Sequence, residues 1–286
     1  MTMTGDILSP CSDIVFRMLF GDARNLDVLR SFLRAALPLP RDDYDELTLQ
    51  DPFLFSAKHD DKASVLDVEA KTKSGKVIDI EIQVANHAAI HARVLYYLSK
   101  IVAKQLKEGG SYKRIKPSIS IFITDFVLLP EEEDYYNDYV FINRKTGRIF
   151  SDLMEIHTLE LPKLPPETDN TSLWAWMRFL KSRTKEELEM LAQRHTELAP
   201  AAKKLIDLSA NDKAWALYEA RLKAERDRIA REEFVREESR EEGLKEGLKE
   251  GQLTIARKAL RRNMPVEDIA ALTGLSPEEI RALQNA

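Results

Sequence analysis

The strongest pattern in the chain lies in residues 64–85, SVLDVEAKTKSGKVIDIEIQVA. Apolar and polar side chains alternate through both halves of this segment, which is typical of two β-strands that each bury one face. The residues 73–76, KSGK, separate the two halves and contain a turn-forming glycine. The pattern therefore predicts a hairpin with strands at 64–72 and 77–85.

The register of this hairpin follows from its apolar faces, because a slip of one residue would move every side chain to the other face. We expect the apolar residues to oppose one another, which requires a turn with an odd number of residues, such as 74–76. The expected apolar pairs are Leu66 with Val84, Val68 with Ile82 and Ala70 with Ile80. The expected polar pairs are Asp67 with Gln83 and Glu69 with Glu81.

Three carboxylates and an amide would thus share one face, with cross-strand neighbours about 4.5–5.5 Å apart. Like charges at this distance repel unless a cation neutralises them, and either Lys71 or a divalent cation could do so. Mg²⁺ binds one or two carboxylates together with water and a substrate phosphate, as in metal-assisted phosphodiester hydrolysis. The solvent-exposed polar face of an ordinary hairpin fits the same pattern, and the two strands alone do not exclude it.

Outside the hairpin, the apolar spacing predicts a mixed α/β fold with a helical C-terminal third. The expected helices are two within 12–37, one at 87–107, and several from Ser172 onward. The expected additional strands are at 47–55, 117–127, 139–143 and 148–158. The run at 117–127, PSISIFITDFV, is nearly continuous in apolar residues, which indicates a strand buried on both faces.

Several short motifs occur along the chain in a recognisable order. They are DIVFRMLF at 13–20, LDVEA at 66–70, IEIQ at 80–83, RVLYYLSK at 93–100, GSYKRIKPS at 110–118 and LELPK at 159–163. In order and spacing the chain resembles the Rpn family of recombination-promoting nucleases, which are transposases of the PD-(D/E)XK superfamily. The resemblance implies an α/β restriction-endonuclease-like core, a mixed sheet flanked by helices, with an all-helical C-terminal extension.

The same resemblance implies roles for the polar residues of the hairpin. Asp67 and Glu81 would bind Mg²⁺, for which Mn²⁺ is expected to substitute, and Gln83 would position the attacking water. Gln83 stands where the superfamily usually has lysine, so it can orient by hydrogen bonds but supplies no positive charge. Asp13 matches a further metal-ligand position, although a cap at the start of the first helix explains an acid there equally well.

Three basic or aromatic residues are expected to contact DNA. Arg93 and Tyr97 lie four residues apart and so share a helix face. By the resemblance this pair touches DNA near the cut, where Arg93 could hold a phosphate bidentately, and Lys71 is a further candidate. The alternative is a surface salt bridge for Arg93 and core packing for Tyr97.

We expect four parts in the chain. They are a PD-(D/E)XK nuclease-like core at 1–165, a helical extension at 166–211, a charged helix at 212–262 and a small tail at 263–286. The charged helix carries glycines at 243, 247 and 251, roughly on one face. It serves either as a self-association helix or as a solvated linker.

The tail resembles a helix-turn-helix, with Gly274 at the turn and Ser276 and Glu279 as a capping box. The expected small core consists of Ile269, Leu272, Leu275 and Ile280. Acidic residues open the second helix, which disfavours approach to phosphate, so an interaction or dimerisation module is an alternative to DNA binding.

Composition narrows the classes of function. The chain has 286 residues, 44% of them hydrophobic, and a formal net charge of −5, whereas simple DNA-coating proteins are strongly basic. It has no apolar run long enough to span a membrane and no secretory signal pattern, and its single cysteine excludes an internal disulfide. We therefore expect a cytoplasmic protein with no membrane partner.

These observations predict a Mg²⁺-dependent DNA endonuclease that hydrolyses phosphodiester bonds in recombination, mobile-element movement or defence. Its expected partners are DNA and further copies of itself, most simply as a dimer, because a double-strand cut needs two active sites. One alternative is a catalytically weak or inactive DNA-binding or regulatory protein on the same fold. Another is a structural assembly protein whose carboxylate face is merely solvated.

Overall fold

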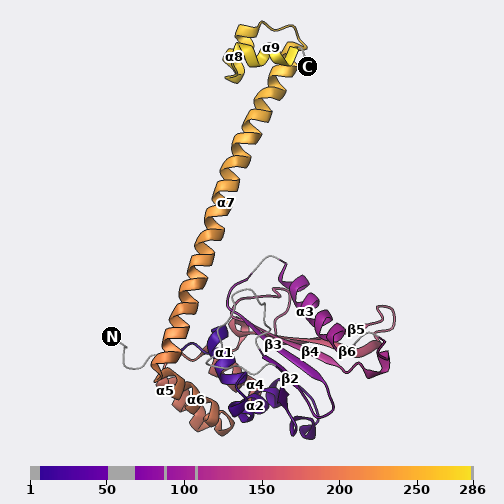
Figure 1. The fold of residues 1–286 in the computed structure, drawn as a ribbon, viewed down its shortest axis with the longest axis vertical. Coiled ribbons are helices and arrows are strands. Elements are labelled where there is room, and N and C mark those ends of the chain that lie inside the picture. Colours follow the sequence, from indigo (N-terminus) through magenta and orange to yellow (C-terminus); the bar gives the residue numbers. More distant parts are fainter. Residues whose placement is uncertain (1–6, 51–67, 87–88, 107–108, 285–286) are drawn as a thin grey trace. The chain divides into compact units, whose positions relative to one another are not determined.

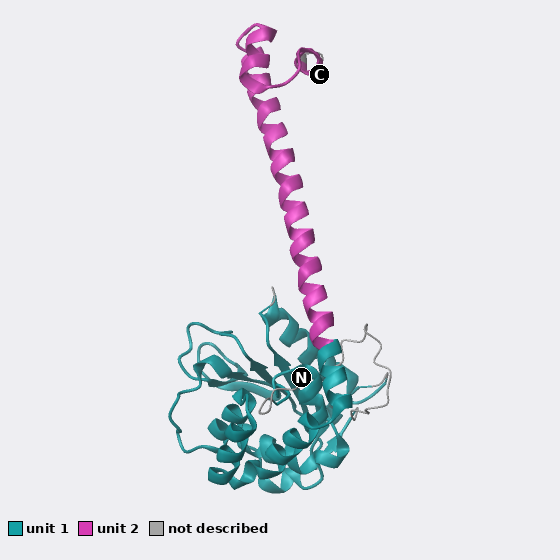
Figure 2. Cartoon of the chain, turned by 90° about the vertical axis from the view of Figure 1, so that its left-hand side faces the viewer, with its two compact units in different colours: residues 1–220 teal, residues 221–286 magenta. Residues whose placement is uncertain are grey.

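The computed structural model describes residues 7–50, 68–86, 89–106 and 109–284. They form two compact units, residues 1–220 and 221–286 (Figure 2). Helix α7 (Asp212–Leu260) begins in the first unit and continues through the second. Each unit has a hydrophobic core of its own.

A six-stranded mixed sheet forms the centre of the first unit (Figure 1). The strands are β1 (Thr48–Leu49), β2 (Val68–Lys71), β3 (Val77–Gln83), β4 (Ser118–Thr124), β5 (Tyr136–Ile142) and β6 (Ile149–Glu160), in the order β1-β2-β3-β4-β6-β5. The three central strands β3, β4 and β6 are parallel, and the outer pairings are antiparallel. All seven residues of β4 are buried, as the continuous apolar run predicts.

Helices cover both faces of the sheet (Figure 1). On one face, α1 (Asp13–Phe20), α2 (Leu26–Ala36) and α4 (Ser172–Lys181) share a core with the isoleucines of β3 and β4, and Trp176 contacts the rings of Phe20 and Phe32. On the other face, α3 (Ile90–Lys104) packs against Phe122 of β4. Helices α5 (Lys185–Arg194) and α6 (Ala199–Ser209) extend the first of these cores. The fold is thus a mixed α/β sheet flanked by helices, with a helical C-terminal part, as the sequence predicts.

The β2–β3 hairpin forms, but its register differs by two residues from the predicted one. Val68 opposes Ile80 rather than Ile82, and Glu69 opposes Asp79 rather than Glu81. A shift of two residues leaves every side chain on its predicted face. The predicted pairs of Leu66 and Asp67 lie outside the described residues.

The turn explains the difference in register. Thr72 donates its backbone N–H to the carbonyl of Lys76, so the three-residue turn is Lys73-Ser74-Gly75 rather than residues 74–76. A three-residue hairpin turn needs a left-handed residue in its last position, and Gly75 supplies it with φ +89°. The predicted turn would place Lys76 there. Asp43 fixes the turn by accepting hydrogen bonds from the backbone and hydroxyl of Ser74 and from Lys76.

The second unit is built from the greater part of α7, from Arg221 onward, and two short helices, α8 (Val266–Thr273) and α9 (Pro277–Gln284). Gly274 has φ +75° between them, and Ser276 and Glu279 form the predicted capping box. Its core consists of Ala256, Ala259, Ile269, Leu275 and Ile280. The prediction for Leu272 is wrong, since its side chain is 65% exposed. Alanines of α7 complete this core instead. No described helix is both long and apolar enough to cross a membrane.

Candidate functional site

Three polar residues of β3 lie on the sheet face that α3 covers. Asp79, Glu81 and Gln83 alternate with isoleucines, whose side chains belong to the core on the opposite face. Asp79 is fully buried and Glu81 is 5% exposed, whereas Gln83 is half-buried at the end of the strand. This face of β3 is therefore not the solvated face of an ordinary hairpin, because the acids lie inside the protein.

Glu81 is the centre of a small network. Its Oε1 accepts a hydrogen bond of 2.7 Å from Nη2 of Arg93 and one of 2.9 Å from Nε2 of Gln83. Burial raises the pKa of the Glu81 carboxyl above its ordinary value, and the nearby Arg93 guanidinium acts in the opposite direction. A carboxyl whose pKa is perturbed both by burial and by a nearby cation is a common feature of functional sites.

Arg93 connects the buried acid to the surface. It lies on the first turns of α3, and its guanidinium carbon is 5.6 Å from the ring centroid of Tyr97. The Arg93 side chain is 39% exposed, so part of the guanidinium remains accessible to an anion from solvent. The predicted helix face is thus present, and the salt bridge of the alternative interpretation is present too, but its partner is the buried Glu81.

The other predicted site residues lie in different surroundings. Asp13 is the first residue of α1, where its carboxylate accepts the backbone N–H of Ile14 at 2.8 Å. Lys71 is exposed at the end of β2 and opposes Val77, which is four residues, or roughly 13 Å, along the strand from Glu81. Asp67 lies outside the described residues. The structure therefore brings together Glu81, Gln83, Arg93 and Tyr97.

Asp79 and Glu160, the two fully buried acids among the described residues, were not predicted as site residues. Asp79 shares the face of Glu81, and the signal that could have identified it is the Asp-Ile-Glu-Ile-Gln alternation itself. Glu160, at the end of β6, is fully buried and accepts hydrogen bonds from Lys163 and from the backbone N–H of Leu128. Glu160 therefore holds the segment after β4 in place.

The oxygen donors on β3 suit a hard divalent cation. Mg²⁺ is bound through one or two carboxylates with water in the remaining positions, and Glu81 and the Gln83 carbonyl oxygen are donors of this kind. Among the described residues, which do not include Asp67, no group of three or more His, Cys, Asp or Glu side chains could hold a metal ion. The described part of β3 thus supplies two oxygen donors of the kind that Mg²⁺ takes.

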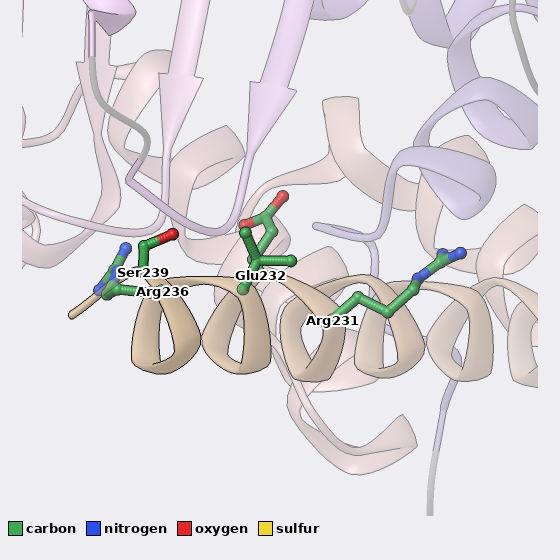
Figure 3. A pocket seen from close by; sticks show the side chains of 5 residues that line it. Arg231, Glu232, Arg236 and Ser239 are labelled. Atoms are coloured by element: carbon green, nitrogen blue, oxygen red, sulfur yellow. The ribbon is translucent and has the colours of Figure 1, made fainter. Parts of the chain in front are cut away.

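A surface hollow on α7 is of a different kind (Figure 3). Its lining residues are Arg231, Glu232, Val235, Arg236 and Ser239. All five are exposed and come from successive turns of one helix. The hollow therefore lacks the buried polar groups that distinguish the face of β3.

Comparison of the sequence with protein-family models gives a match, which covers the sheet and the residues of the candidate site. The family model for PD-(D/E)XK nuclease family transposases matches residues 10–233. The match includes the six strands of the sheet, helices α1 to α6 and the first part of α7. Comparisons with curated proteins and with solved structures give no match.

Proposed function

Because the chain belongs to the PD-(D/E)XK nuclease family transposases, we propose that it is a metal-dependent DNA endonuclease whose reactive centre lies at Glu81. The observation that carries the proposal is the Glu81 carboxylate, buried to 5% exposure on β3 and hydrogen-bonded by Gln83 and Arg93. In this proposal the reaction serves recombination, mobile-element movement or defence against foreign DNA.

In the proposed site, Asp67 and Glu81 would hold Mg²⁺ or Mn²⁺, and Asp13 would be a further candidate ligand. A divalent cation there would withdraw charge from the scissile phosphate and acidify a water molecule. Gln83 orients that water by hydrogen bonds, because its amide both donates and accepts. Burial beneath α3 lowers the local dielectric constant, which strengthens each of these interactions.

Arg93 has two roles in the proposal. Without DNA its guanidinium neutralises Glu81, at 2.7 Å from Oε1. With DNA the accessible part of the guanidinium holds a phosphate, since arginine matches phosphate oxygens bidentately. The Tyr97 ring beside it limits the directions in which the guanidinium can turn. Arg93 thereby supplies the positive charge that a lysine at position 83 would otherwise provide.

A second candidate is a catalytically weak or inactive DNA-binding or regulatory protein on the same fold. Gln83 is neutral, and Arg93 and Gln83 both occupy Oε1 of Glu81. A carboxylate oxygen with two donors is less available to a metal ion. This candidate predicts DNA binding without turnover.

Cleavage of supercoiled plasmid in Mg²⁺, in Mn²⁺ and in EDTA tests the proposal. Asp67→Ala and Glu81→Gln proteins are compared with wild type, and Glu186→Ala, which changes an exposed acid on α5, is the matched control. We expect nicking or linearisation that requires metal, persists in the control and disappears in both site variants.

Two other results have defined meanings. Intact plasmid with every metal, together with retained DNA binding by the folded protein, would favour the second candidate. Metal-dependent cleavage that persists in both site variants would show that Asp67 and Glu81 are not the metal ligands.

A further inference from the structure

Strand β5 is an outer strand of the sheet that the described residues form. It is the last strand in the sheet order, and among the described residues it pairs only with β6 (Figure 1). An exposed edge presents a row of free N–H and C=O groups that can pair with another strand. Proteins usually protect such edges with short strands, charges or covering segments.

The backbone groups on the outer edge of β5 can be assigned from the hydrogen bonds on its inner edge. The N–H of Glu160 donates to the carbonyl of Tyr135 at 2.8 Å, so Tyr135 faces β6. Antiparallel strands alternate between inward and outward groups, which directs those of Tyr136, Asp138 and Val140 outward. The extra residues at the two register shifts, 152–154 and Phe150, lie in β6, so β5 runs without an insertion.

The C-terminal half of β5 and the start of β6 also expose apolar side chains. The exposed residues are Val140, Phe141, Ile142, Ile149 and Phe150, with fractions from 37% to 85%. All five belong to one two-stranded ribbon around the turn at 143–148. Large apolar side chains exposed on one ribbon are candidates for an interaction surface.

The charges along the strand are separated by sign. Before β5 lie the exposed acids Glu131, Glu132, Glu133 and Asp134, and after it lie the exposed bases Arg144, Lys145 and Arg148. A strand with an acidic beginning and a basic end complements a second copy of itself that runs in the opposite direction. A parallel copy would instead oppose like charges.

We infer that β5 is the surface through which two copies of this chain dimerise, by antiparallel pairing of their β5 edges about a two-fold axis near Tyr139. This pairing joins two sheets into one and is isologous, as in most homodimers. It opposes Asp134 to Arg144 of the other copy and Glu133 to its Lys145. It also places Val140, Phe141 and Ile142 beside residues 136–138 of the other copy.

The position of the ribbon favours this partner over DNA. Strands β3, β4 and β6 are parallel, and Gln83 is level with Thr124 and Glu160 at their C-terminal ends. The turn at 143–148 lies at the opposite end of β6, up to roughly 30 Å from the level of Glu81. The basic turn is therefore far from its own proposed site. In the dimer, the basic turn of the other copy lies at the same end of the sheet as the site.

Light scattering and sedimentation of the full chain test the inference without DNA or metal, so the result is independent of the proposed nuclease function. We expect a mass of twice 32.8 kDa that dissociates on dilution and at high salt. Asp138→Pro removes an outward N–H and no bond to β6, and we expect it to weaken the dimer by at least ~tenfold. Thermal unfolding verifies that the variant is folded.

Charge-reversal variants test the proposed pairing of acidic and basic residues directly. One variant carries Glu133→Lys with Asp134→Lys, and the other carries Arg144→Glu with Lys145→Glu. Each alone opposes like charges across the two-fold axis and is expected to be monomeric, whereas a 1:1 mixture of the two restores complementary charges and the dimer.

Three results would overturn the inference. They are a wild-type protein that stays monomeric at every concentration, a dimer that persists in folded Asp138→Pro protein, and a mixture that fails to associate. If the wild type is monomeric and the Arg144→Glu, Lys145→Glu protein loses DNA binding, the ribbon is a DNA-binding surface instead.

Discussion

Arg93 determines how the candidate site can receive DNA. Its guanidinium bonds a buried carboxylate and is still 39% exposed. One phosphate contact from an arginine contributes about 1.5–3 kcal/mol as a charge-assisted hydrogen bond. The guanidinium can contact a phosphate only if its other N–H groups make the contact or if it breaks its bond to Glu81. The long, planar side chain of arginine allows both.

Arg93→Ala is expected to weaken DNA binding by about tenfold or more and to lower the salt dependence by roughly one phosphate contact. Arg93→Lys should retain the salt dependence but recover only part of the affinity, since lysine cannot bind bidentately. Fluorescence anisotropy with labelled duplex at several salt concentrations measures both quantities. Arg194→Ala, which changes an exposed arginine on α5, is the control. Equal affinities for wild type and Arg93→Ala would exclude this contact.

Asp43 shows how one carboxylate fixes the hairpin that carries the site. Burial by itself would raise the pKa of Asp43, but hydrogen bonds from Ser74 and Lys76 lower it to about 2. A carboxyl whose pKa is lowered on folding stabilises the native state above its unfolded pKa. That stabilisation is lost as the pH falls through the folded value.

Asp43→Asn is therefore expected to reduce the free energy of unfolding by roughly 2 kcal/mol at pH 7. The difference from wild type should shrink between about pH 4 and pH 2, where Asp43 becomes protonated in the wild type. Urea denaturation of both proteins across this range measures the difference. A difference that does not change with pH would indicate that Asp43 acts through packing rather than charge.

At the scale of elements, sequence patterns predicted most of the sheet. Alternation identified β3, and the continuous apolar run identified β4. The hairpin register could not be derived from alternation, because registers two residues apart bury the same faces. The turn decided between them through Gly75 and Asp43, which lies thirty-one residues before Ser74 and has no sequence signal for this contact.

Within the candidate site, sequence patterns indicate which face a residue occupies but not how deeply it is buried. Glu81, Gln83, Arg93 and Tyr97 lie together because a strand followed by a helix on one sheet face fixes their relation. Burial depth was not predictable: Asp79 is fully buried and Leu272 is exposed. Alternation reports which face a residue occupies but not what covers that face.

Replacing either of two glycines in the helical C-terminal part by alanine is expected to change stability, in opposite directions. Gly247 is helical, and an added Cβ would have no neighbour within 4 Å, so Gly247→Ala should stabilise α7 by about 1 kcal/mol. Gly274 has φ +75°, so Gly274→Ala should destabilise the α8–α9 unit by about 1–2 kcal/mol. Hydrogen exchange of the backbone amides in α7 and α9 measures each effect locally. Loss of protection in α7 on Gly247→Ala would show that the glycine is needed for a close contact.

At the scale of the whole molecule, the two hydrophobic cores share no residues. The first core consists of residues from Ile7 to Ala214, and the second of residues from Ala256 to Ile280. Between them α7 is exposed from Glu232 to Gly251. Cooperativity in unfolding depends on shared buried contacts. The two units should therefore unfold independently.

We expect calorimetry of the full chain to show two thermal transitions. A chain ended after Glu233 keeps the whole first core and the region matched by the family model. It should show one transition, within about 2 °C of the larger transition of the full chain, because the removed residues contribute nothing to the first core. Plasmid cleavage by this shortened protein should remain if the proposed site is complete in the first unit. A fall of the melting temperature by more than about 5 °C would mean that the second unit contributes directly to the stability of the first.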